Sequence, residues 1–418
     1  MRTIKQIDIR SFITTSTLPA LYSHAYDATQ ILYDPELKAY FIGCYADVND
    51  VLRSPSFTTT PLGQRAQPVM GERVLAQMDG FEHHSKRKGV LSGLTGHLFR
   101  EKYSTMITEI TESILKRFLP AGEIDLISEF GKEYGVKVTL RVLGLPTERH
   151  EEVATWHHGI ANFITSLDLT DTERKFSLDC SKRLIQYLTP LIEHKIQHPD
   201  ESLISAIYGS TPPEQKMTTA ELVALVLNIL LAATEPADKT LAYLFKHLLE
   251  QPELFQRVVN DRSLLTSAIN ETLRMSSPVQ LIPRQAEQGA TLPGMKFSSG
   301  DLVFCMVGAA NRDPSAYHAA SEFRIDRRVE SHSKHEKISP HLAFGAGPHV
   351  CVGAAFSMMQ IKLTANLILD HMKDLRLAPD CSFHEDGFYT RGFSTLRLQF
   401  SPSTLTLTPS KHPTDAYA

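Results

Sequence analysis

One stretch decides how this chain is interpreted: His341-Leu342-Ala343-Phe344-Gly345-Ala346-Gly347-Pro348-His349-Val350-Cys351-Val352-Gly353. Its glycines and proline exclude a helix and indicate a tight turn that ends at Cys351. From Gly353 to about Asp370, apolar residues recur at helical spacing. Cys351 is therefore expected at or just before a helix N-terminus, where the positive end of the helix dipole favours the metal-binding thiolate.

A lone thiolate in a glycine loop suits a metal site with one protein ligand. The other cysteines are scattered at positions 44, 180, 305 and 381, whereas structural zinc sites use four protein ligands. Haem needs one proximal ligand because the porphyrin supplies the remaining four. A small buried cysteine that follows a turn is the alternative reading of Cys351.

The pattern Phe344-Gly-x-Gly-x-His349-x-Cys351-x-Gly353 resembles the haem-binding loop of the cytochrome P450 family, the haem-thiolate monooxygenases. The resemblance runs from about residue 29 to about residue 400. It implies a mainly α-helical fold with small β-sheets, one domain over residues 1–400 and a C-terminal tail over residues 401–418. Haem b would lie between the long central helix and the cysteine-loop helix, with Cys351 as the iron ligand and Phe344 against the ring.

Basic residues elsewhere match the contacts that this family makes to haem. His83 and Arg87 are four residues apart, so on a helix they share a face. Taken alone, they would belong to a solvated basic helix start. The resemblance implies that His83, Arg87 and Arg284 bind the haem propionates, where a guanidinium can hold a carboxylate in bidentate fashion, and that His349 belongs to the same cofactor-binding set.

Composition and charge exclude several other classes of protein. The formal net charge of −4 gives no support for nucleic-acid binding. An odd number of cysteines without a C-x-x-C pair indicates a reducing compartment. The N-terminus lacks a signal-like apolar core, and the longest apolar run, 222–233, is too short to span a membrane. We therefore expect a cytoplasmic enzyme with neither nucleic-acid nor membrane partners.

The longest helical pattern, Thr219 to Glu250, contains a proline at position 236. Proline inside a helix removes a hydrogen bond and costs roughly 3 kcal/mol, which marks either a harmless bend or a functional site. In the family, a small-small-x-acid-Thr run lies here, and its acid–alcohol pair delivers protons on the oxygen-binding side of the haem. Ala232-Ala233-Thr234-Glu235 matches the first four positions, and Pro236 replaces the threonine.

Other residues are predicted to be structural or to line the pocket. Glu271 and Arg274 share a helix face and, taken alone, would be a surface ion pair. The resemblance implies that they form a structural triad with Arg327. Residues 56–80, with several Thr, Pro and Gly, predict a long loop. The apolar residues expected around a substrate are Phe163, Ala232, Ala233, Val279, Leu281 and Phe393.

The resemblance implies a monooxygenase that uses molecular oxygen and electrons from a ferredoxin and its reductase. Three stretches, 231–240, 278–285 and 308–314, resemble a member that oxidises a cyclic dipeptide of two leucines to a di-N-hydroxylated, aromatised ring. A diketopiperazine of secondary metabolism is the substrate this implies. Three alternatives remain open: a peroxide-driven oxidase, another secondary-metabolite substrate, or a haem protein that binds a ligand without chemistry. Glu235 favours oxygen, because peroxide users carry arginine there.

Overall fold

The computed structural model describes residues 2–12, 18–95, 97–210, 216–327 and 341–403. The helices are α1 (Leu18–Ala25), α2 (Tyr45–Arg53), α3 (Thr60–Met70), α4 (Gly80–Ser92), α5 (His97–Phe118), α6 (Lys132–Leu143), α7 (His150–Thr165), α8 (Asp171–Gln197), α9 (Leu203–Ser210), α10 (Thr219–Leu249), α11 (Pro252–Asn260), α12 (Leu265–Met275), α13 (Val307–Ala310) and α14 (Ala354–His371). Short helical turns are η1 (Ile9–Phe12), η2 (Leu75–Gln77), the π-helical η3 (Leu126–Gly131), η5 (Arg262–Leu264) and η6 (Gly347–His349).

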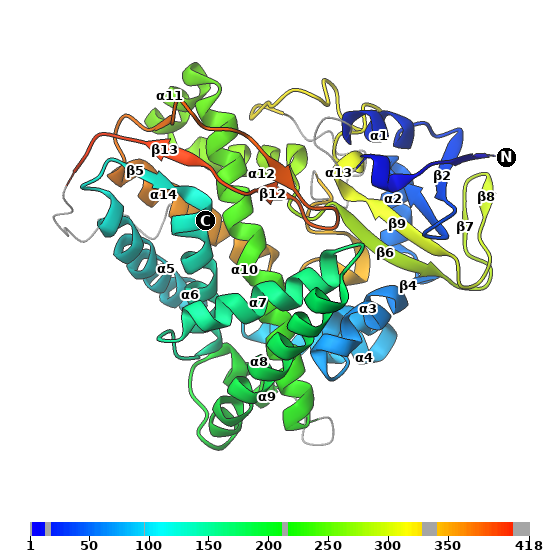
Figure 1. Cartoon of the computed structure of the whole chain (residues 1–418), viewed down its shortest axis with the longest axis horizontal. Coiled ribbons are helices and arrows are strands. Elements are labelled where there is room, and N and C mark those ends of the chain that lie inside the picture. Colours follow the sequence, from blue (N-terminus) through cyan, green and yellow to red (C-terminus); the bar gives the residue numbers. More distant parts are fainter. Residues whose placement is uncertain (1, 13–17, 96, 211–215, 328–340, 404–418) are drawn as a thin grey trace.

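The strands are short, and six of those in the described part of the chain form the main sheet. They are β1 (Thr3–Gln6), β2 (Gln30–Asp34), β3 (Ala39–Ile42), β4 (Phe57–Thr58), β5 (Glu123–Asp125), β6 (Leu281–Ala286), β7 (Thr291–Leu292), β8 (Met295–Lys296), β9 (Leu302–Met306), β10 (Arg376–Leu377), β11 (Glu385–Asp386), β12 (Gly392–Phe393) and β13 (Arg397–Gln399). The main sheet has the order β1-β2-β3-β9-β6-β4, and smaller sheets join β10-β13-β5, β11-β12 and β7-β8. Figure 1 shows the main sheet at one side of the molecule, with α1, α2 and α13 beside it, and most of the longer helices at the other side. The predicted mainly helical fold with small sheets is thus confirmed.

Helix α10 runs through the middle of the helical part (Figure 1). It begins at a capping box, in which the Thr218 hydroxyl accepts from the Glu221 N–H and the Glu221 carboxylate accepts from the Thr218 N–H. It packs against α6, α8, α12 and α14. Its length and composition would suit a membrane span, but half of its most apolar window is buried in the fold, as in a core helix. Pro236 does not end the helix, which is continuous from Thr219 to Leu249.

The predicted long loop over residues 56–80 is wrong. The structure has β4, α3 and η2 in that stretch. Pro61 lies in the first turn of α3, where a missing N–H costs nothing because those donors have no partner inside the helix. The threonines and prolines that indicated a loop are therefore a helix start, and Pro68 is tolerated inside the last turns.

Candidate active site

The cysteine loop is a tight turn that leads directly into α14. The Cys351 N–H donates to the Phe344 carbonyl at 2.8 Å, which closes the loop. Gly345 and Gly347 have φ values of 71° and 69°, a left-handed conformation that favours glycine. A side chain at Gly347 would also come within 2.6 Å of the Leu52 carbonyl on α2. The loop thus packs against α2 only with glycine at position 347.

Cys351 is an exposed, free cysteine three residues before α14 begins. The expectation that its position favours the thiolate is only partly met. Protein atoms around the sulfur desolvate it and raise the pKa of the thiol, while the Gly353 N–H and the charge of Arg87 lower it; the net direction is upward. Desolvation therefore outweighs the local dipoles. A bound metal cation would be needed to hold this residue as a thiolate.

Four basic side chains gather beside the cysteine loop. The rings of His83 and His349 stack with centroids 4.1 Å apart. Burial lowers the pKa of His83 to about 4, and the charges of His349 and Arg87 lower it further. Arg87 is half-buried, and its guanidinium has no hydrogen-bond or ion-pair partner within the described part of the chain. Arg284 is buried and donates to the Pro283 carbonyl at 2.9 Å. The cluster is an incompletely neutralised site for an anion.

Asp79 is the carboxylate of this cluster, and no sequence pattern singles it out. It accepts hydrogen bonds from the Thr59 N–H and hydroxyl at 3.1 and 2.9 Å, and its Oδ1 lies 2.9 Å from Nε2 of His349. Burial would raise the pKa of Asp79, but these hydrogen bonds lower it overall; burial also lowers the pKa of His349. A neutral imidazole that donates to an ionised carboxylate accounts for both directions.

Glu235 is held by two basic residues on its own and a neighbouring helix. Its Oε2 accepts from Nζ of Lys239 at 2.7 Å, one turn along α10, and its Oε1 lies 3.8 Å from Nδ1 of His157 on α7. Burial would raise the pKa of Glu235, but the charges of Lys239 and His157 lower it overall. Its side chain keeps 28% of its surface accessible, and the lowered pKa favours the ionised form at neutral pH.

The centre of α10 is accessible although the helix belongs to the core. Ala232 is exposed, and Leu231, Ala233 and Pro236 are partly exposed, while the flanking turns are mostly buried. Helix α14, which follows the exposed Cys351, packs against α10. The accessible centre of α10 and the exposed Cys351 before α14 therefore belong to two helices that pack together. This arrangement suits a flat group that covers both helices.

Glu271 and Arg274 of α12 form the predicted ion pair, and it is buried rather than superficial. Arg274 is 2% exposed and donates to both Glu271 carboxylate oxygens at 2.8 and 2.9 Å. Arg274 also donates to three backbone carbonyls, and Arg327 contacts the same carboxylate at 3.2 Å. The network ties α12 to the segment that leads to the cysteine loop.

The residues predicted around a substrate do not all lie in one place. Phe393 packs against Tyr243 of α10, with ring centroids 4.7 Å apart, and Phe163 lies buried beneath the Arg174 guanidinium. Val279 bridges to the hairpin tip at Thr390. The place of Ala232, Ala233, Val279, Phe163 and Phe393 in a substrate pocket stays a prediction.

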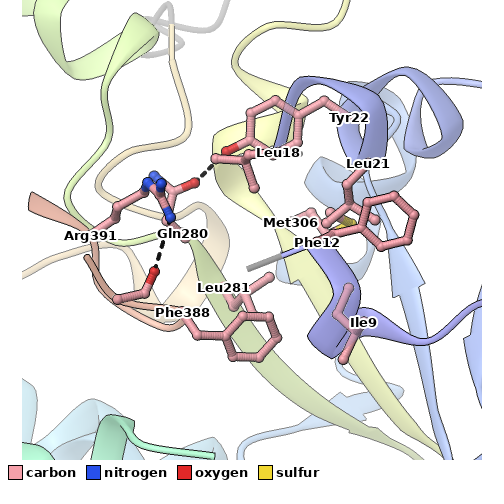
Figure 2. Close-up of a pocket in the computed structure, with 11 residues that line it drawn as sticks. Ile9, Phe12, Leu18, Leu21, Tyr22, Gln280, Leu281, Met306, Phe388 and Arg391 are labelled. Carbon is pink, nitrogen blue, oxygen red and sulfur yellow. Dashed lines mark hydrogen bonds between the residues drawn. The ribbon is translucent and has the colours of Figure 1, made fainter. Parts of the chain in front are cut away.

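Leu281 belongs to a different space. Figure 2 shows Leu281 among side chains of η1, α1, β9 and the segment that follows β11, which line a small pocket. The polar groups there satisfy one another: the Tyr22 hydroxyl donates to Gln280 at 2.5 Å, and Arg391 pairs with Glu385. Leu281 also packs in a core cluster with residues of η1, α1 and the main sheet, and its place beside a substrate stays a prediction.

The residues present fit haem. Cys351 offers one sulfur ligand, and among the described residues no group of three or more His, Cys, Asp or Glu side chains is arranged to hold a metal ion. Arg87, a half-buried cation to which none of the described residues is paired, suits an anionic propionate. A mainly helical fold with one cysteine loop and a basic cluster beside it defines a haem-thiolate protein.

Comparison with known proteins leads to the same class. The family model described as Cytochrome P450 matches residues 147–375. The chain is 43% identical to pulcherriminic acid synthase of Bacillus subtilis (strain 168) over 383 residues, which cover 91% of this chain and 94% of that protein. It is 28% identical to cytochrome P450 107B1 of Saccharopolyspora erythraea, over 84% of this chain and 81% of that one. The crystal structure of CalO2 superposes with a TM-score of 0.82 at 20% identity, covering 93% and 96% of the two chains.

The chain therefore belongs to the cytochrome P450 family and is an oxidoreductase of the monooxygenase type. The family implies a haem cofactor. Three residues of the site escaped the sequence reasoning: Asp79, His157 and Lys239. Lys239 carried a usable signal, because a lysine four residues after Glu235 on a helix predicts an ion pair. The partners of Asp79 and His157 come from distant segments and had no such signal.

Proposed function

We propose that this enzyme oxidises a cyclic dipeptide such as cyclo(Leu-Leu) to pulcherriminic acid, by N-oxidation and aromatisation of the ring. The observation that carries the proposal is the 43% identity to pulcherriminic acid synthase across nearly the whole of both chains. The apolar, partly accessible centre of α10 suits a neutral apolar substrate. We further propose haem b as the cofactor, ferredoxin and its reductase as electron donors, and the cytoplasm as the location.

In this proposal Cys351 ligates the iron, and His83, Arg87, Arg284 and His349 hold the propionates. The bound haem supplies the oxidising chemistry. The protein must then move protons into a pocket from which bulk water is largely excluded. Glu235 is the acid for that task, because it is ionised, partly accessible and placed mid-way along α10.

Pro236 leaves the pocket without the hydroxyl that usually accompanies this acid. A diketopiperazine carries its own N–H groups, and its oxidised forms carry N–OH groups. We propose that these groups replace the missing alcohol in ordering the proton route. The cost of a proline in α10 would then be offset by a substrate that brings the polar group itself.

A binding titration tests the substrate. Cyclo(Leu-Leu) added to the haem-loaded protein should shift the haem's optical spectrum saturably, while a cyclic dipeptide of two aspartates, of the same ring but charged, should not. Reduction under carbon monoxide should give the red-shifted absorption that thiolate ligation produces, and Cys351→Ala should abolish it. A silent titration across apolar cyclic dipeptides would reject the substrate but leave the class intact.

A peroxide-driven oxidase is the second candidate, because of Pro236. Turnover with ferredoxin, its reductase and NADPH can be compared with turnover in hydrogen peroxide alone. The ionised Glu235 favours the ferredoxin route, since proton delivery is needed when oxygen is the oxidant. Faster product formation with peroxide alone would favour the second candidate.

A further inference from the structure

The backbone carbonyl of Ala232 on α10 lacks its usual helical donor. In an α-helix the carbonyl of each residue accepts a hydrogen bond from the N–H four residues further along the chain. Four residues after Ala232 stands Pro236, whose nitrogen carries no hydrogen. Helix α10 is nevertheless continuous from Thr219 to Leu249, so the carbonyl keeps its place in the helix. The donor is therefore missing for a covalent reason.

Threonine hydroxyls serve carbonyls in the neighbouring turns of α10 but not this one. The Thr234 hydroxyl donates to the Leu230 carbonyl at 2.7 Å. The Thr240 hydroxyl donates to the Pro236 carbonyl at 2.6 Å. In both pairs the hydroxyl lies four residues after the carbonyl, and for Ala232 that position is again Pro236, which has no hydroxyl. Position 236 thus withholds both kinds of donor from Ala232.

The surroundings of Pro236 differ from those of other prolines inside the described helices. Pro68 of α3 and Pro190 of α8 are both exposed. The carbonyls that they leave without a helical donor belong to Gln64 and Gln186, which are exposed too, so bulk water can donate instead. Helix α10 is a core helix that packs against α6, α8, α12 and α14. A carbonyl without a donor is more costly there, which favours a specific partner.

The Ala232 carbonyl faces the accessible side of α10. Helical carbonyls point toward the C-terminal end, so this one points toward the Pro236 ring, whose bulk tilts it away from the helix. Ala232 is exposed and Pro236 is partly exposed, and residues four apart share a helix face. The carbonyl oxygen is therefore an acceptor at the accessible centre of α10, where we place the substrate.

We propose that the Ala232 carbonyl accepts a hydrogen bond from a lactam N–H of the substrate, and that Pro236 keeps this acceptor free. A diketopiperazine is a ring of two lactams, each with an N–H in the plane of the ring. Cyclo(Leu-Leu) has a two-fold axis, so either N–H can make the bond while the other points away across the ring. The carbonyl thus selects and orients apolar rings that carry a secondary lactam. The inference rests on the proposed function and deepens it by naming the atom that recognises the substrate.

A double-mutant cycle between protein and ligand tests this hydrogen bond. Pro236→Ala restores the N–H to α10. The cyclic diester with the same ring size and the same isobutyl groups replaces each ligand N–H by oxygen. Isothermal titration calorimetry on the haem-loaded proteins gives the dissociation constants. We expect the wild type to bind cyclo(Leu-Leu) about ten-fold more tightly than the diester, as one neutral hydrogen bond allows, and Pro236→Ala to lose most of this preference.

Two further variants control for the shape of the helix. Pro190→Ala also replaces a proline inside a helix by alanine, and it should keep the wild-type preference for the lactam. Pro236→Thr should lose the preference as Pro236→Ala does, because threonine offers Ala232 both an N–H and a hydroxyl. A change of pocket shape alone would weaken both ligands alike. An unchanged preference in both Pro236 variants, or no preference in the wild type, would overturn the inference.

The proposed function can fail separately. If cyclo(Leu-Leu) does not bind, the substrate assignment is wrong. The inference then holds only if cyclic dipeptides with other apolar side chains bind more tightly than their diesters and Pro236→Ala removes the difference. If cyclo(Leu-Leu) is bound and oxidised but is not preferred over its diester, the substrate stands and the inference is wrong. If no cyclic dipeptide binds, both are wrong.

Discussion

Replacing Asp238 with asparagine should stabilise the folded protein at neutral and alkaline pH and leave its stability in acid nearly unchanged. Asp238 is 9% exposed on α10, and its Oδ1 accepts from the Lys239 N–H at 2.7 Å. Burial raises the pKa of its carboxyl to about 7, against the opposing charge of Lys239. A side chain on Gly131 of η3 would come within 2.8 Å of this carboxylate, so there is little room for water.

The size of the effect follows from proton linkage. The unfolded carboxyl ionises near pH 4, whereas the folded one keeps its proton to about pH 7. Between these values folding takes up a proton, so wild-type stability falls by about 1.4 kcal/mol per pH unit and then levels off. The advantage of Asp238→Asn over the wild type should therefore grow by about 2 kcal/mol between pH 5.5 and pH 8.5.

Urea unfolding of the haem-loaded proteins, followed by far-UV circular dichroism at several pH values, measures this difference. The wild type serves as the reference at each pH, so other titrating groups cancel. Asp179→Asn, which removes one exposed surface charge on α8, is the control for the substitution itself. An advantage of Asp238→Asn that stays constant across the pH range would show that burial does not keep this carboxyl protonated.

Arg274→Leu should lower the free energy of unfolding in urea by about 3–5 kcal/mol, because it leaves the buried Glu271 carboxylate without its main partner. Arg183→Ala, which breaks an exposed ion pair, is the control and should have little effect. Equal losses of stability in the two variants would refute this reasoning. Arg65 of α3 donates to the backbone that ends α7 and lies 4.8 Å above the Tyr389 ring, so Arg65→Ala should free this end of α7 from α3 and lower the midpoint of urea unfolding. An unchanged midpoint would refute a role in holding these segments together. Pro236→Thr should not improve coupling with the cyclic dipeptide; a many-fold gain would show that the proline is a defect.

The parts of the site that the sequence predicted are those with local chemistry. The glycines and the proline before Cys351 predict the tight turn. The helical spacing that begins at Gly353 predicts that Cys351 lies just before a helix. The i, i+3 pair of Glu271 and Arg274 needs only helical geometry. Whether that pair was buried could not be predicted, because burial depends on the backbone carbonyls that surround Arg274 from residues 311 to 322.

The errors arose where a side chain's surroundings come from distant segments. Asp79 and His349 are 270 residues apart, and nothing local joins them. The stretch 56–80 was misjudged for a different reason, because threonine and proline are typical both of loops and of helix starts.

Two carboxylates three residues apart on α10 have pKa values that their surroundings shift in opposite directions, and that difference separates their roles. Glu235 faces α7, with Lys239 and His157 beside it, and these charges lower its pKa. Asp238 lies against η3, where burial raises its pKa to about 7. Adjacent acids whose environments push their pKa values apart are typical of acid–base chemistry, and of these two only Glu235 keeps a partly accessible side chain. The buried Asp238 therefore belongs to the packing of α10 against η3, and Glu235 is the carboxylate that we propose for proton transfer.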